Sequence, residues 1–531
     1  MDDKLREEIN RRRTFAIISH PDAGKTTLTE KFLLFGGAIN TAGSVKGKAN
    51  SKYAVSDWMD IEKERGISVT SSVLQFNYDG YCINILDTPG HQDFSEDTYR
   101  TLMAADSAVM VIDASKGVEA QTIKLFKVCV MRHIPIFTFI NKMDRDARDT
   151  FELLDDIETV LGIKTCPVNW PIGSGKEFKG VYDRKTKIVS TFQAISTGGA
   201  KKAEETDYHI DDEALKELVG PYLFDQFNEE IELIDGATEE MDIEKVRAGE
   251  LSPVFFGSAL NTFGIEQFLN YFLKMTTPPI GRNSSEGIID PVTEPFSAFV
   301  FKIQANMNKA HRDRIAFMRI CSGKFEAGME VYHAASKRKI KLSQPQQLMA
   351  QDRKIVDEAY AGDVIGVFDP DLFSIGDTLT TGGKKFEYEG IPTFAPEHFC
   401  RVVQLNSMKR KQFVKGVTQI AQEGAIQIFQ EYTAGLSEII VGVVGVLQFD
   451  VLKYRLENEY GCEIRLEPIP YNYIRWVKDP TIDVTKLKRV SDVKKVKDMK
   501  GNPLLLFANE WVIDQVLQHN EGLVLEEFRK N

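Results

Sequence analysis

The sequence has no stretch of about 18 uninterrupted apolar residues, the length that a membrane-spanning helix needs. Its first residues carry many charges and no apolar core of signal-peptide length. The six cysteines are scattered, and no two form a C-x-x-C pair, which disfavours disulfides and zinc sites and favours buried free thiols. We therefore expect a cytoplasmic protein with no membrane partner.

The chain has 531 residues, of which 43% are apolar, enough to form several hydrophobic cores. Because domains run at roughly 100–200 residues each, the length predicts about three of them. The formal net charge of -12 argues against a protein that coats nucleic acid. It leaves open docking on a ribonucleoprotein through local basic patches.

The N-terminal part alternates strand-like apolar runs with helical patterns. We expect a helix at residues 25–35 and strands at residues 15–18, 81–86, 108–112, 134–140 and 254–257. Such alternation is typical of a parallel sheet covered by helices on both faces, which binds ligands at the C-terminal ends of its strands. Between about residues 162 and 250 it breaks down into short β-like runs and an acidic, helix-prone segment, which we interpret as an insertion.

The rest of the chain predicts two further domains. Short strand-like runs punctuated by glycine, at residues 296–303, 314–322 and 364–367, favour a small antiparallel β-barrel. Beyond a proline- and glycine-rich cluster, a strand pattern at 439–442 and a helix pattern at 446–457 favour an α+β domain. The predicted fold is thus multidomain, with an α/β domain at residues 1–280 that contains an insertion at about 162–250, a β-barrel at 291–388 and an α+β domain at 395–531.

Five short segments occur in order along the chain, each at the end of an apolar run. They are S-H-P-D-A-G-K-T (residues 19–26), R-G-I-S (65–68), D-T-P-G-H (87–91), N-K-M-D (141–144) and S-A-L (258–260). Any one of them can arise by chance, but the ordered set is typical of proteins that bind phosphate, magnesium and guanine. We therefore interpret the α/β domain as a P-loop GTPase domain that binds GTP or GDP together with Mg²⁺.

The first segment is expected to bind the phosphates. A strand–loop–helix turn offers backbone N–H groups and a helix N-terminus to negative charge. Gly24 lets the backbone approach the phosphates, and Lys25 is placed to reach the β- and γ-phosphates. Ser19 stands where such loops usually have glycine. The predicted phosphate-binding residues are Ser19, His20, Pro21, Asp22, Ala23, Gly24, Lys25, Thr26 and Thr27.

Three residues are predicted to serve Mg²⁺. The hydroxyl of Thr26 binds the ion directly, and Asp87, at the end of an apolar strand, supports it from beyond the directly bound ligands. Ser68 is expected to complete the magnesium site only when GTP supplies its third phosphate. The segment at residues 36–52 is interpreted as a switch ordered by that phosphate, with a plain solvent loop as the alternative.

The fourth and fifth segments are expected to select guanine. A carboxylate at Asp144 can accept two hydrogen bonds, from N1–H and from the exocyclic amine of guanine, a pattern that adenine lacks. The aliphatic stem of Lys142 can cover the face of the ring. The N–H of Ala259 is expected to meet the guanine O6. The predicted base-binding residues are Asn141, Lys142, Met143, Asp144, Ser258, Ala259 and Leu260.

His91 is the catalytic candidate. A lone histidine is more often a surface or helix-start residue, but directly after D-T-P-G it occupies the position from which a side chain orients the water that attacks the γ-phosphate. The sequence leaves open whether it acts as a base or only positions water. Pro21 and Ile67 are expected to screen it with apolar surface. This segment adds Asp87, Thr88, Pro89, Gly90 and His91 to the predicted GTP-binding residues.

The D-T-P-G-H and R-G-I-S segments resemble those of the translational GTPases, the ribosome-dependent family that includes elongation factor G. Three longer strings resemble one branch of it, the bacterial release factor 3 family of class-II release factors. They are S-D-W-M-D-I-E-K-E-R-G-I-S (residues 56–68), F-V-F-K-I-Q-A-N-M-N-K-A-H-R-D-R-I-A-F-M-R (299–319) and G-V-L-Q-F-D-V (445–451). The resemblance covers essentially the whole chain, and Ser19 and Ser68 fit this branch.

The resemblance implies a ribosome-stimulated GTPase that uses GTP to expel a class-I release factor from the ribosome after the peptide is freed. The implied partners are rRNA, ribosomal proteins and class-I release factors, and we expect a monomer. The chain lacks the G-G-Q tripeptide that class-I factors use to promote peptidyl-tRNA hydrolysis, so we expect no peptide release by this chain itself. Basic clusters at residues 337–341, 409–415 and 486–500 suit rRNA contact, although charge runs are usually solvated faces.

Three alternatives stay open at this point. A sibling translocase of the elongation factor G type would need further domains after the third. A GTP-binding regulatory scaffold would hydrolyse little GTP, which His91 and the magnesium residues disfavour. A metabolic enzyme that uses GTP or ATP would need a second substrate motif, and N-K-M-D disfavours ATP.

Overall fold

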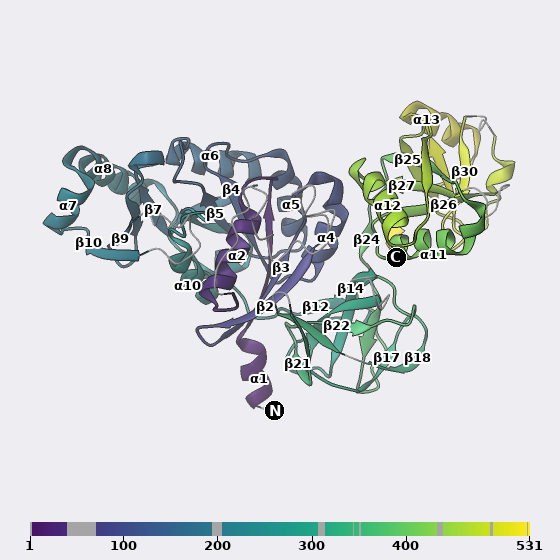
Figure 1. Ribbon diagram of the computed structural model, residues 1–531, viewed down its shortest axis with the longest axis horizontal. Coiled ribbons are helices and arrows are strands. Elements are labelled where there is room, and N and C mark those ends of the chain that lie inside the picture. Colours follow the sequence, from purple (N-terminus) through teal and green to yellow (C-terminus); the bar gives the residue numbers. More distant parts are fainter. Residues whose placement is uncertain are drawn as a thin grey trace.

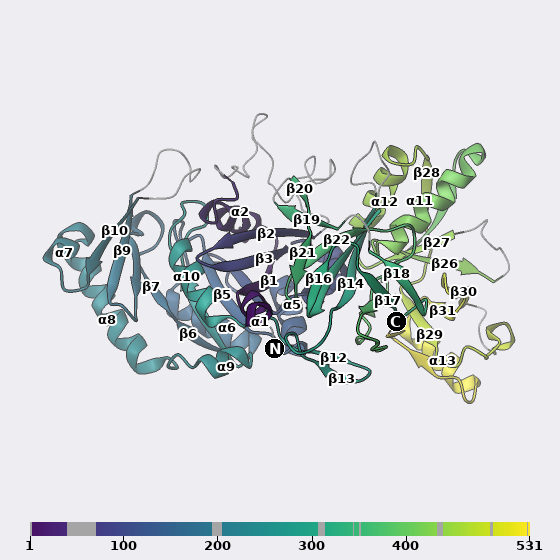
Figure 2. The same cartoon turned by 90° about the horizontal axis from the view of Figure 1, so that it is seen from below.

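The computed structural model describes residues 3–39, 71–193, 204–305, 314–342, 345–349, 352–432, 439–488, 492–527 and 529–530. The molecule is elongated, with the α/β domain towards one end and the C-terminal domain at the other, and Figure 1 shows the barrel below the place where these two domains meet (Figures 1 and 2). Within the described ranges, every helix is too short or too polar to cross a membrane.

A seven-stranded sheet in the order β2-β3-β1-β4-β5-β11-β6 forms the centre of the α/β domain. Its strands are β1 (Arg12–Ser19), β2 (Ser72–Tyr78), β3 (Tyr81–Asp87), β4 (Ser107–Asp113), β5 (Ile136–Asn141), β6 (Lys164–Pro167) and β11 (Leu251–Phe256). All are parallel to their neighbours, as predicted, except β2, which pairs antiparallel with β3. Asp79 and Gly80, both with positive φ, join β2 to β3, and a two-residue turn of this kind permits only an antiparallel pair.

Alternate residues of β1 face opposite sides of this sheet. Ala16 and Ile18 belong to the core beneath α4, α5 and α6, whereas Phe15 and Ile17 belong to the core beneath α2 and α10. Phe15 meets Phe272 of α10 edge to face, with 4.7 Å between ring centroids. The covering helices are α2 (Lys25–Phe35), α4 (Ser95–Met103), α5 (Ala120–Met131), α6 (Thr150–Leu161) and α10 (Ile265–Met275). Both faces are thus covered, which leaves the strand ends as the place for a ligand.

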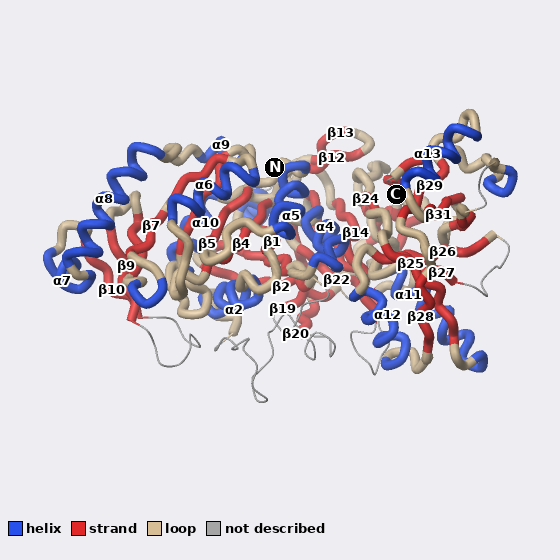
Figure 3. Tube along the Cα trace, turned by 90° about the horizontal axis from the view of Figure 1, so that it is seen from above, coloured by secondary structure: helices blue, strands red, loops and turns tan. Residues whose placement is uncertain are grey.

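The segment between β6 and β11 forms a separate antiparallel sheet in the order β10-β9-β8-β7, and its helices α7 and α8 lie at the end of the molecule far from the C-terminal domain (Figure 3). Its elements are β7 (Asn169–Ile172), η2 (Gly175–Glu177), β8 (Gly180–Asp183), β9 (Ile188–Gln193), β10 (Glu204–His209), α7 (Glu213–Val219), α8 (Pro221–Ala237) and α9 (Ile243–Arg247). The Nε1 of buried Trp170 donates to Glu230 of α8 at 2.7 Å, which fastens this helix to the sheet. β6 falls in the range predicted as inserted, but it pairs with β11 in the main sheet.

An antiparallel barrel-like domain follows the hairpin of β12 (Arg282–Ser284) and β13 (Gly287–Ile289). Its eight-stranded sheet has the order β18-β17-β23-β14-β15-β22-β19-β20, beside the pair β16–β21. The strands are β14 (Ser297–Ala305), β15 (Arg314–Ser322), β16 (Lys324–Glu326), β17 (Glu330–His333), β18 (Arg338–Lys341), β19 (Gln346–Met349), β20 (Asp352–Ile355), β21 (Glu358–Tyr360), β22 (Val364–Phe368) and β23 (Thr378–Thr380). The first helix, α1 (Asp3–Asn10), inserts Ile9 into the core of this domain.

The C-terminal domain is α+β, as predicted, with a sheet in the order β28-β25-β27-β26-β30-β31-β29-β32. Its strands are β24 (Pro392–Thr393), β25 (His398–Gln404), β26 (Gln427–Glu431), β27 (Ile439–Val443), β28 (Ile464–Pro468), β29 (Tyr473–Val477), β30 (Lys494–Lys497), β31 (Pro503–Phe507), β32 (Leu525–Glu526) and β33 (Arg529–Lys530). Its helices are η3 (Ser407–Lys409), α11 (Arg410–Gln422), α12 (Leu447–Asn458), η5 (Val484–Lys486) and α13 (Glu510–His519). α13 lies at the opposite end of the domain from α11 and α12 (Figures 2 and 3).

Candidate functional site

The loop between β1 and α2 is built for close approach of the backbone. Gly24 stands directly before α2 with a φ of 98°, in the left-handed region that favours glycine. A Cβ on Gly24 would lie 2.2 Å from Nδ2 of Asn141. Both the backbone conformation and the packing therefore require glycine at this position.

The predicted phosphate lysine lies between this loop and the end of β3. The Nζ of Lys25 forms an ion pair with Oδ1 of Asp87, and only 6% and 2% of the two side chains are exposed. Thr26 and Thr27 lie half-buried on the first turn of α2. The structure thus brings the N-terminus of α2 to the carboxyl end of β3, as the order of the motifs predicts.

Two polar atoms in the first segment are buried without a hydrogen-bond partner among the described residues. They are Oγ of Ser19 and Nδ1 of His20. A buried polar atom without a partner costs about 1–3 kcal/mol. Such atoms at the end of β1 mark a place where a ligand or water completes the hydrogen bonding.

Asn141 connects the first, fourth and fifth segments. Its Nδ2 donates to the carbonyl of Ala23 at 2.8 Å, and its Oδ1 accepts from the N–H groups of Lys142 and Ala259, both at 2.8 Å. The N–H of Ala259, for which we predict a contact with the guanine O6, donates to Oδ1 of Asn141. Buried Met143 adds a further hydrogen bond between the fourth segment and the residues just before the fifth, because its N–H donates to the carbonyl of Gly257 at 3.1 Å.

Asp144 and Lys142 follow Asn141 at the end of β5. Oδ1 of Asp144 is buried with no hydrogen-bond donor among the described residues. The Nζ of Lys142 donates to Oδ2 of Asp113 at 2.7 Å and to the carbonyl of Asp22 at 2.5 Å. Burial works against ionisation of Asp113, but the hydrogen bonds from Lys142 and Ser115 outweigh it and lower the pKa of this carboxyl. Asp113 therefore holds the stem of Lys142 in place as a carboxylate.

The remaining residues of the fifth segment form a tight turn after β11. The N–H of Ser258 donates to the carbonyl of Phe263 at 3.0 Å, and Oγ of Ser258 accepts from the N–H of Asn261 at 3.3 Å. Leu260 is 36% exposed. This turn presents Ala259 to Asn141 and leaves the side chain of Leu260 at the surface.

The D-T-P-G-H segment leads from β3 into the short helix η1 (Gln92–Phe94). The hydroxyl of Thr88 donates to the carbonyl of Ile17 at 2.6 Å, and the carbonyl of Pro89 accepts from Thr98 at 3.2 Å. A Cβ on Gly90 would lie 3.7 Å from Cα of Pro21, so this glycine lies against the first segment. The segment is therefore held at both ends beside the phosphate-binding loop.

His91 caps η1 with its own side chain. Its Nδ1 accepts a hydrogen bond from the N–H of Asp93 at 3.2 Å, and 30% of its side chain is exposed. A neutral imidazole that accepts at Nδ1 carries its proton on Nε2. The same Nδ1 lies 3.3 Å from Oδ1 of Asp93, so both the backbone and the carboxylate of Asp93 hold the ring on this side.

Two residues just after His91, which the motifs did not include, contact the C-terminal domain. Oδ2 of Asp93 accepts from the N–H of Leu447 at 2.8 Å. The guanidinium of Arg100 on α4 donates to the carbonyls of Glu423 and Gly424 at 3.1 and 2.7 Å. No local pattern in the sequence indicates these contacts, since the partners lie more than 300 residues apart. The role of Asp113, in contrast, could have been predicted, because this aspartate ends an apolar strand as Asp87 does.

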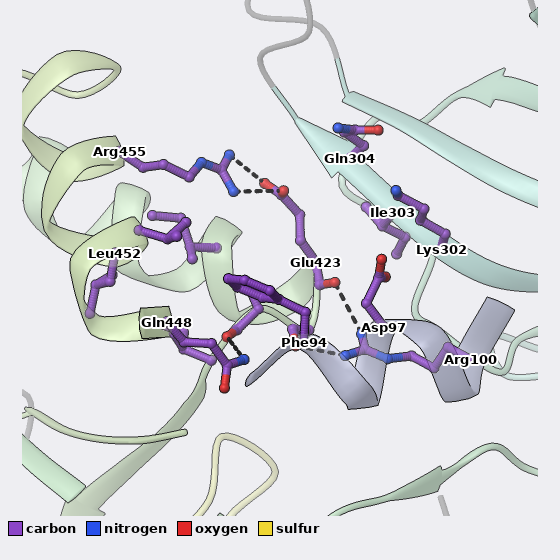
Figure 4. A pocket seen from close by; sticks show the side chains of 15 residues that line it. Phe94, Asp97, Arg100, Lys302, Ile303, Gln304, Glu423, Gln448, Leu452 and Arg455 are labelled. Atoms are coloured by element: carbon purple, nitrogen blue, oxygen red, sulfur yellow. Dashed lines mark hydrogen bonds and ion pairs between the residues drawn. The ribbon is translucent and has the colours of Figure 1, made fainter. Parts of the chain in front are cut away.

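Figure 4 shows this junction, where α4, β14 and the helices α11 and α12 surround a cavity of about 50 Å³. Glu423 forms an ion pair with Arg455 at 2.9 Å, and its backbone carbonyl accepts from Arg100. Burial raises the pKa of Asp97, but the charges of Lys302 and Arg100 and the hydrogen bonds from Ser71 outweigh it and lower that pKa. The three domains thus meet through buried charges.

Some predicted residues lie outside the described part of the chain. They are Ser68, the R-G-I-S segment that contains it, Ile67 of the expected apolar screen, and residues 40–52 of the expected switch. Their predicted roles stay predictions.

Three family models together match most of the chain. The elongation factor Tu GTP binding domain matches residues 10–278, elongation factor G domain 2 matches residues 295–382, and the class II release factor RF3 C-terminal domain matches residues 388–517. Peptide chain release factor 3 from Symbiobacterium thermophilum is 57% identical, covering 98% of each chain. The chain belongs to the peptide chain release factor 3 family.

Further comparisons agree with this membership. Peptide chain release factor 3 from Gloeothece citriformis is 52% identical, over 98% of this chain and 96% of its own length. A crystal structure of a protein from Thermus thermophilus shares the fold, with a TM-score of 0.68 and 22% identity over 92% of this chain and 72% of that one. The fold is therefore a P-loop GTPase domain, a barrel of the elongation factor G domain 2 type and a release factor C-terminal domain.

As a member of the release factor 3 family, the protein binds GTP or GDP and is a GTPase of translation termination. The same relationships imply the ribosome as its partner. The C-terminal domain matches release factors, and this match favours a termination factor over an elongation factor G type translocase or a regulatory scaffold.

Proposed function

We propose that the ribosome stimulates GTP hydrolysis by this release factor 3 protein, and that GTP drives a class-I release factor off the ribosome after peptide release. The observation that carries this proposal is the contact between η1, α4 and the C-terminal domain. Asp93 and Arg100 follow His91 closely and hold the backbone of a domain more than 300 residues away. A change in the backbone around His91 on hydrolysis must therefore move or break contacts of the C-terminal domain.

Phosphate and guanine binding are proposed for the residues of the five motifs. Lys25 and the N–H groups of the loop around Gly24 bind the phosphates, and Asp144 with Asn141 and Lys142 selects guanine. The buried, unmatched Oδ1 of Asp144 supports this assignment, because a guanine N–H would satisfy it.

Mg²⁺ fits the oxygen donors at the phosphate end. The hydroxyl of Thr26 is the kind of hard oxygen ligand that this ion prefers, and the carboxylate of Asp87 would support the ion from beyond the directly bound ligands. The described residues contain no group of three or more His, Cys, Asp or Glu that could hold a metal by themselves, so phosphate oxygens and water supply the other ligands. When bound, Mg²⁺ neutralises charge on the phosphates. Ser68 is proposed to join these ligands when GTP is present.

His91 is proposed to orient the attacking water rather than to remove its proton. The N–H of Asp93 is directed at Nδ1, and in the tautomer that accepts this hydrogen bond the ring carries its proton at Nε2. A donor at Nε2 can hold the water oxygen but cannot accept its proton. Glutamine at this position retains a donor, whereas alanine does not.

The decisive experiment is GTP turnover with and without ribosomes for wild type, His91→Ala and His91→Gln. We expect turnover that depends on ribosomes, a loss of at least 100-fold in His91→Ala, and partial recovery in His91→Gln, since a positioned catalytic group contributes roughly 10²–10⁴-fold. GDP affinity should be equal in all three proteins. Turnover independent of ribosomes, or equal in wild type and His91→Ala, would contradict the mechanism.

The termination step needs a separate assay. Ribosomes that carry a labelled class-I release factor after peptide release are mixed with the protein and GTP, GDP or a non-hydrolysable GTP analogue. We expect GTP to accelerate departure of the label and GDP not to. Equal departure with all three nucleotides would show that this protein does not recycle class-I factors.

Two basic clusters are proposed to contact rRNA. Arg338, Lys339 and Lys341 are exposed on the β17–β18 hairpin, and Lys411 and Lys415 are exposed on α11. Reversal of charge in a cluster that contacts rRNA should weaken ribosome binding and reduce its salt dependence. We further propose that the protein is a cytoplasmic monomer, which sedimentation of the purified chain and cell fractionation would test.

A further inference from the structure

A second cavity, of about 120 Å³, lies where the GTPase domain, the β12–β13 hairpin and the barrel meet. Asp106 lines it directly before β4, whereas Asp113, at the other end of β4, holds Lys142 in the guanine site. The cavity is therefore at the opposite end of this strand from the nucleotide site, and nothing in the GTPase reaction uses it.

Three arginines from different parts of the chain line this cavity. Arg132 follows α5, Arg282 begins β12, and Arg319 lies on β15 of the barrel. Asp106 forms an ion pair with Arg319, with 2.5 Å between the charged atoms. Glu389 supplies the other carboxylate that lines the cavity, and this residue is exposed to solvent. The buried part of the cavity therefore has more guanidinium groups than carboxylates.

Two of the guanidinium groups also have unmet donors. The Nε atoms of Arg132 and Arg282 are both buried, and neither has an acceptor among the described residues. Other contacts hold Arg282 rigidly: its guanidinium lies 3.7 Å from the centroid of the Phe299 ring, and its Nη1 donates to the carbonyl of Met103 at 2.7 Å. A preformed cationic donor that lacks an acceptor in a buried place is suited to an anion.

The electrostatics of the cavity agree with this geometry. Burial lowers the pKa of Arg282 to about 10, and the neighbouring charge of Arg132 adds to the effect. Burial also lowers the pKa of Arg132. The two cations therefore destabilise each other, and an anion between them would relieve both the repulsion and the loss of hydration.

We propose that this cavity binds a phosphate-class oxyanion between Arg132 and Arg282, beside Arg319, whose guanidinium already donates to Asp106 and to the carbonyl of Gly362. Guanidinium groups match the oxygens of phosphate in pairs, which gives such a site geometric selectivity over chloride. A water needs roughly 10–15 Å³ of such volume, so the cavity has room for several water-sized groups and thus for one phosphate group. Because both the GTPase domain and the barrel line the cavity, the bound anion links the two domains.

The test titrates inorganic phosphate into the full chain saturated with GDP and Mg²⁺, so that the nucleotide site is already occupied. Isothermal titration calorimetry at constant ionic strength should show one saturable site. A parallel titration with sodium chloride should show none. Absence of saturable phosphate binding would overturn the proposal.

Variants locate the site. Arg132→Gln should weaken phosphate binding at least tenfold, and Arg132→Lys should weaken it less, because lysine keeps the charge but loses the paired donors. Arg247→Gln removes a half-exposed arginine of α9 and should bind phosphate as wild type does. Equal affinity of wild type and Arg132→Gln, or equal weakening in Arg247→Gln, would overturn the proposal. Arg132→Gln is the main variant because Arg282 also supports the packing around Phe299.

A final arm asks where the phosphate comes from. Ribose 5-phosphate carries the same group on a bulky sugar. Tighter binding of inorganic phosphate assigns the cavity to a free ion, and tighter binding of ribose 5-phosphate assigns it to a phosphorylated small molecule. Either result supports the oxyanion site if Arg132→Gln weakens the binding of the compound that binds more tightly.

Discussion

The carboxylate of Asp93 accepts a hydrogen bond from the backbone N–H of Leu447 at 2.8 Å, although 354 positions separate the two residues in the chain. The N–H of the same Asp93 donates to Nδ1 of His91. One residue therefore contacts both the catalytic candidate of the GTPase domain and the first turn of α12 in the C-terminal domain. This arrangement makes the junction sensitive to any movement of the segment after β3.

Gly445→Ala should separate this junction. A Cβ at position 445 would lie 2.1 Å from Cγ of Asp93 and 2.5 Å from its Cα, so the C-terminal domain has to move away. We expect GDP affinity to stay as in wild type, because a Cβ at position 445 meets Asp93 rather than the phosphate- and guanine-binding segments, while ribosome-stimulated GTP turnover changes severalfold. Small-angle X-ray scattering should show a more extended or more variable molecule.

Gly236→Ala is the matched control. Gly236 lies in α8, and a Cβ added there would have no other heavy atom within 4 Å, so alanine should raise the free energy of unfolding by about 0.5–1 kcal/mol without altering scattering or turnover. If Gly445→Ala scatters X-rays and turns over GTP as Gly236→Ala does, the Asp93–Leu447 contact has no role in coupling the domains.

Asp144→Asn should change which base the protein binds. The proposed role of the carboxylate is to accept from two guanine N–H groups, whereas an amide offers a donor that suits the additional carbonyl of xanthine. We expect GTP affinity to fall by at least 100-fold and xanthosine triphosphate to bind better than GTP, as measured by displacement of a fluorescent nucleotide. Asp146→Asn, at an exposed position two residues on, should bind GTP as wild type does. Unchanged GTP affinity in Asp144→Asn would place guanine elsewhere.

Asn141→Ala should reduce both stability and nucleotide affinity. The substitution removes the acceptor of two N–H groups and the donor to Ala23, each at 2.8 Å. Because buried N–H groups without partners cost about 1–3 kcal/mol each, we expect the GTPase domain to lose about 2–5 kcal/mol of stability. Differential scanning calorimetry with and without GDP measures both effects. Asn77→Ala, at an exposed position of β2, should change little, and an equal loss there would refute the role of Asn141.

Much of the nucleotide site could be predicted because each motif combines local chemistry with the end of a strand. The helix α2 spans the predicted residues 25–35, and β3 ends at Asp87 beside Lys25, since parallel neighbours place their carboxyl ends together. The antiparallel edge strand β2 could not be derived from an α/β alternation alone. It depends on the two-residue turn at Asp79 and Gly80.

Contacts between domains left no local signal in the sequence. The N–H of Leu447 and the carbonyl of Gly424 are backbone groups, which every residue possesses, so nothing marks them as partners of Asp93 and Arg100. Likewise, the insertion of Ile9 from α1 into the core of the barrel depends on the arrangement of the whole chain. The N–H of Ala259 donates to Oδ1 of Asn141, and its contact with the guanine O6 stays a prediction.

The ion pair between Lys142 and Asp113 should give the GTPase domain a specific dependence on acid. Hydrogen bonds from Lys142 and Ser115 lower the pKa of Asp113 below its ordinary value of 3.8, despite burial. A carboxyl whose pKa is lowered by folding stabilises the folded state above the pKa it has when unfolded, and loses that contribution as the pH falls through its folded pKa. Asp113→Asn should therefore lower the free energy of unfolding by about 1–2 kcal/mol at pH 7. The difference from wild type should shrink below about pH 4.

Calorimetric unfolding of both proteins between pH 7 and pH 3 measures this difference in stability. Asp225→Asn, on the exposed face of α8, is the control and should follow wild type throughout. A difference that stays constant, or grows, as the pH falls would show that Asp113 does not act as a carboxylate toward Lys142.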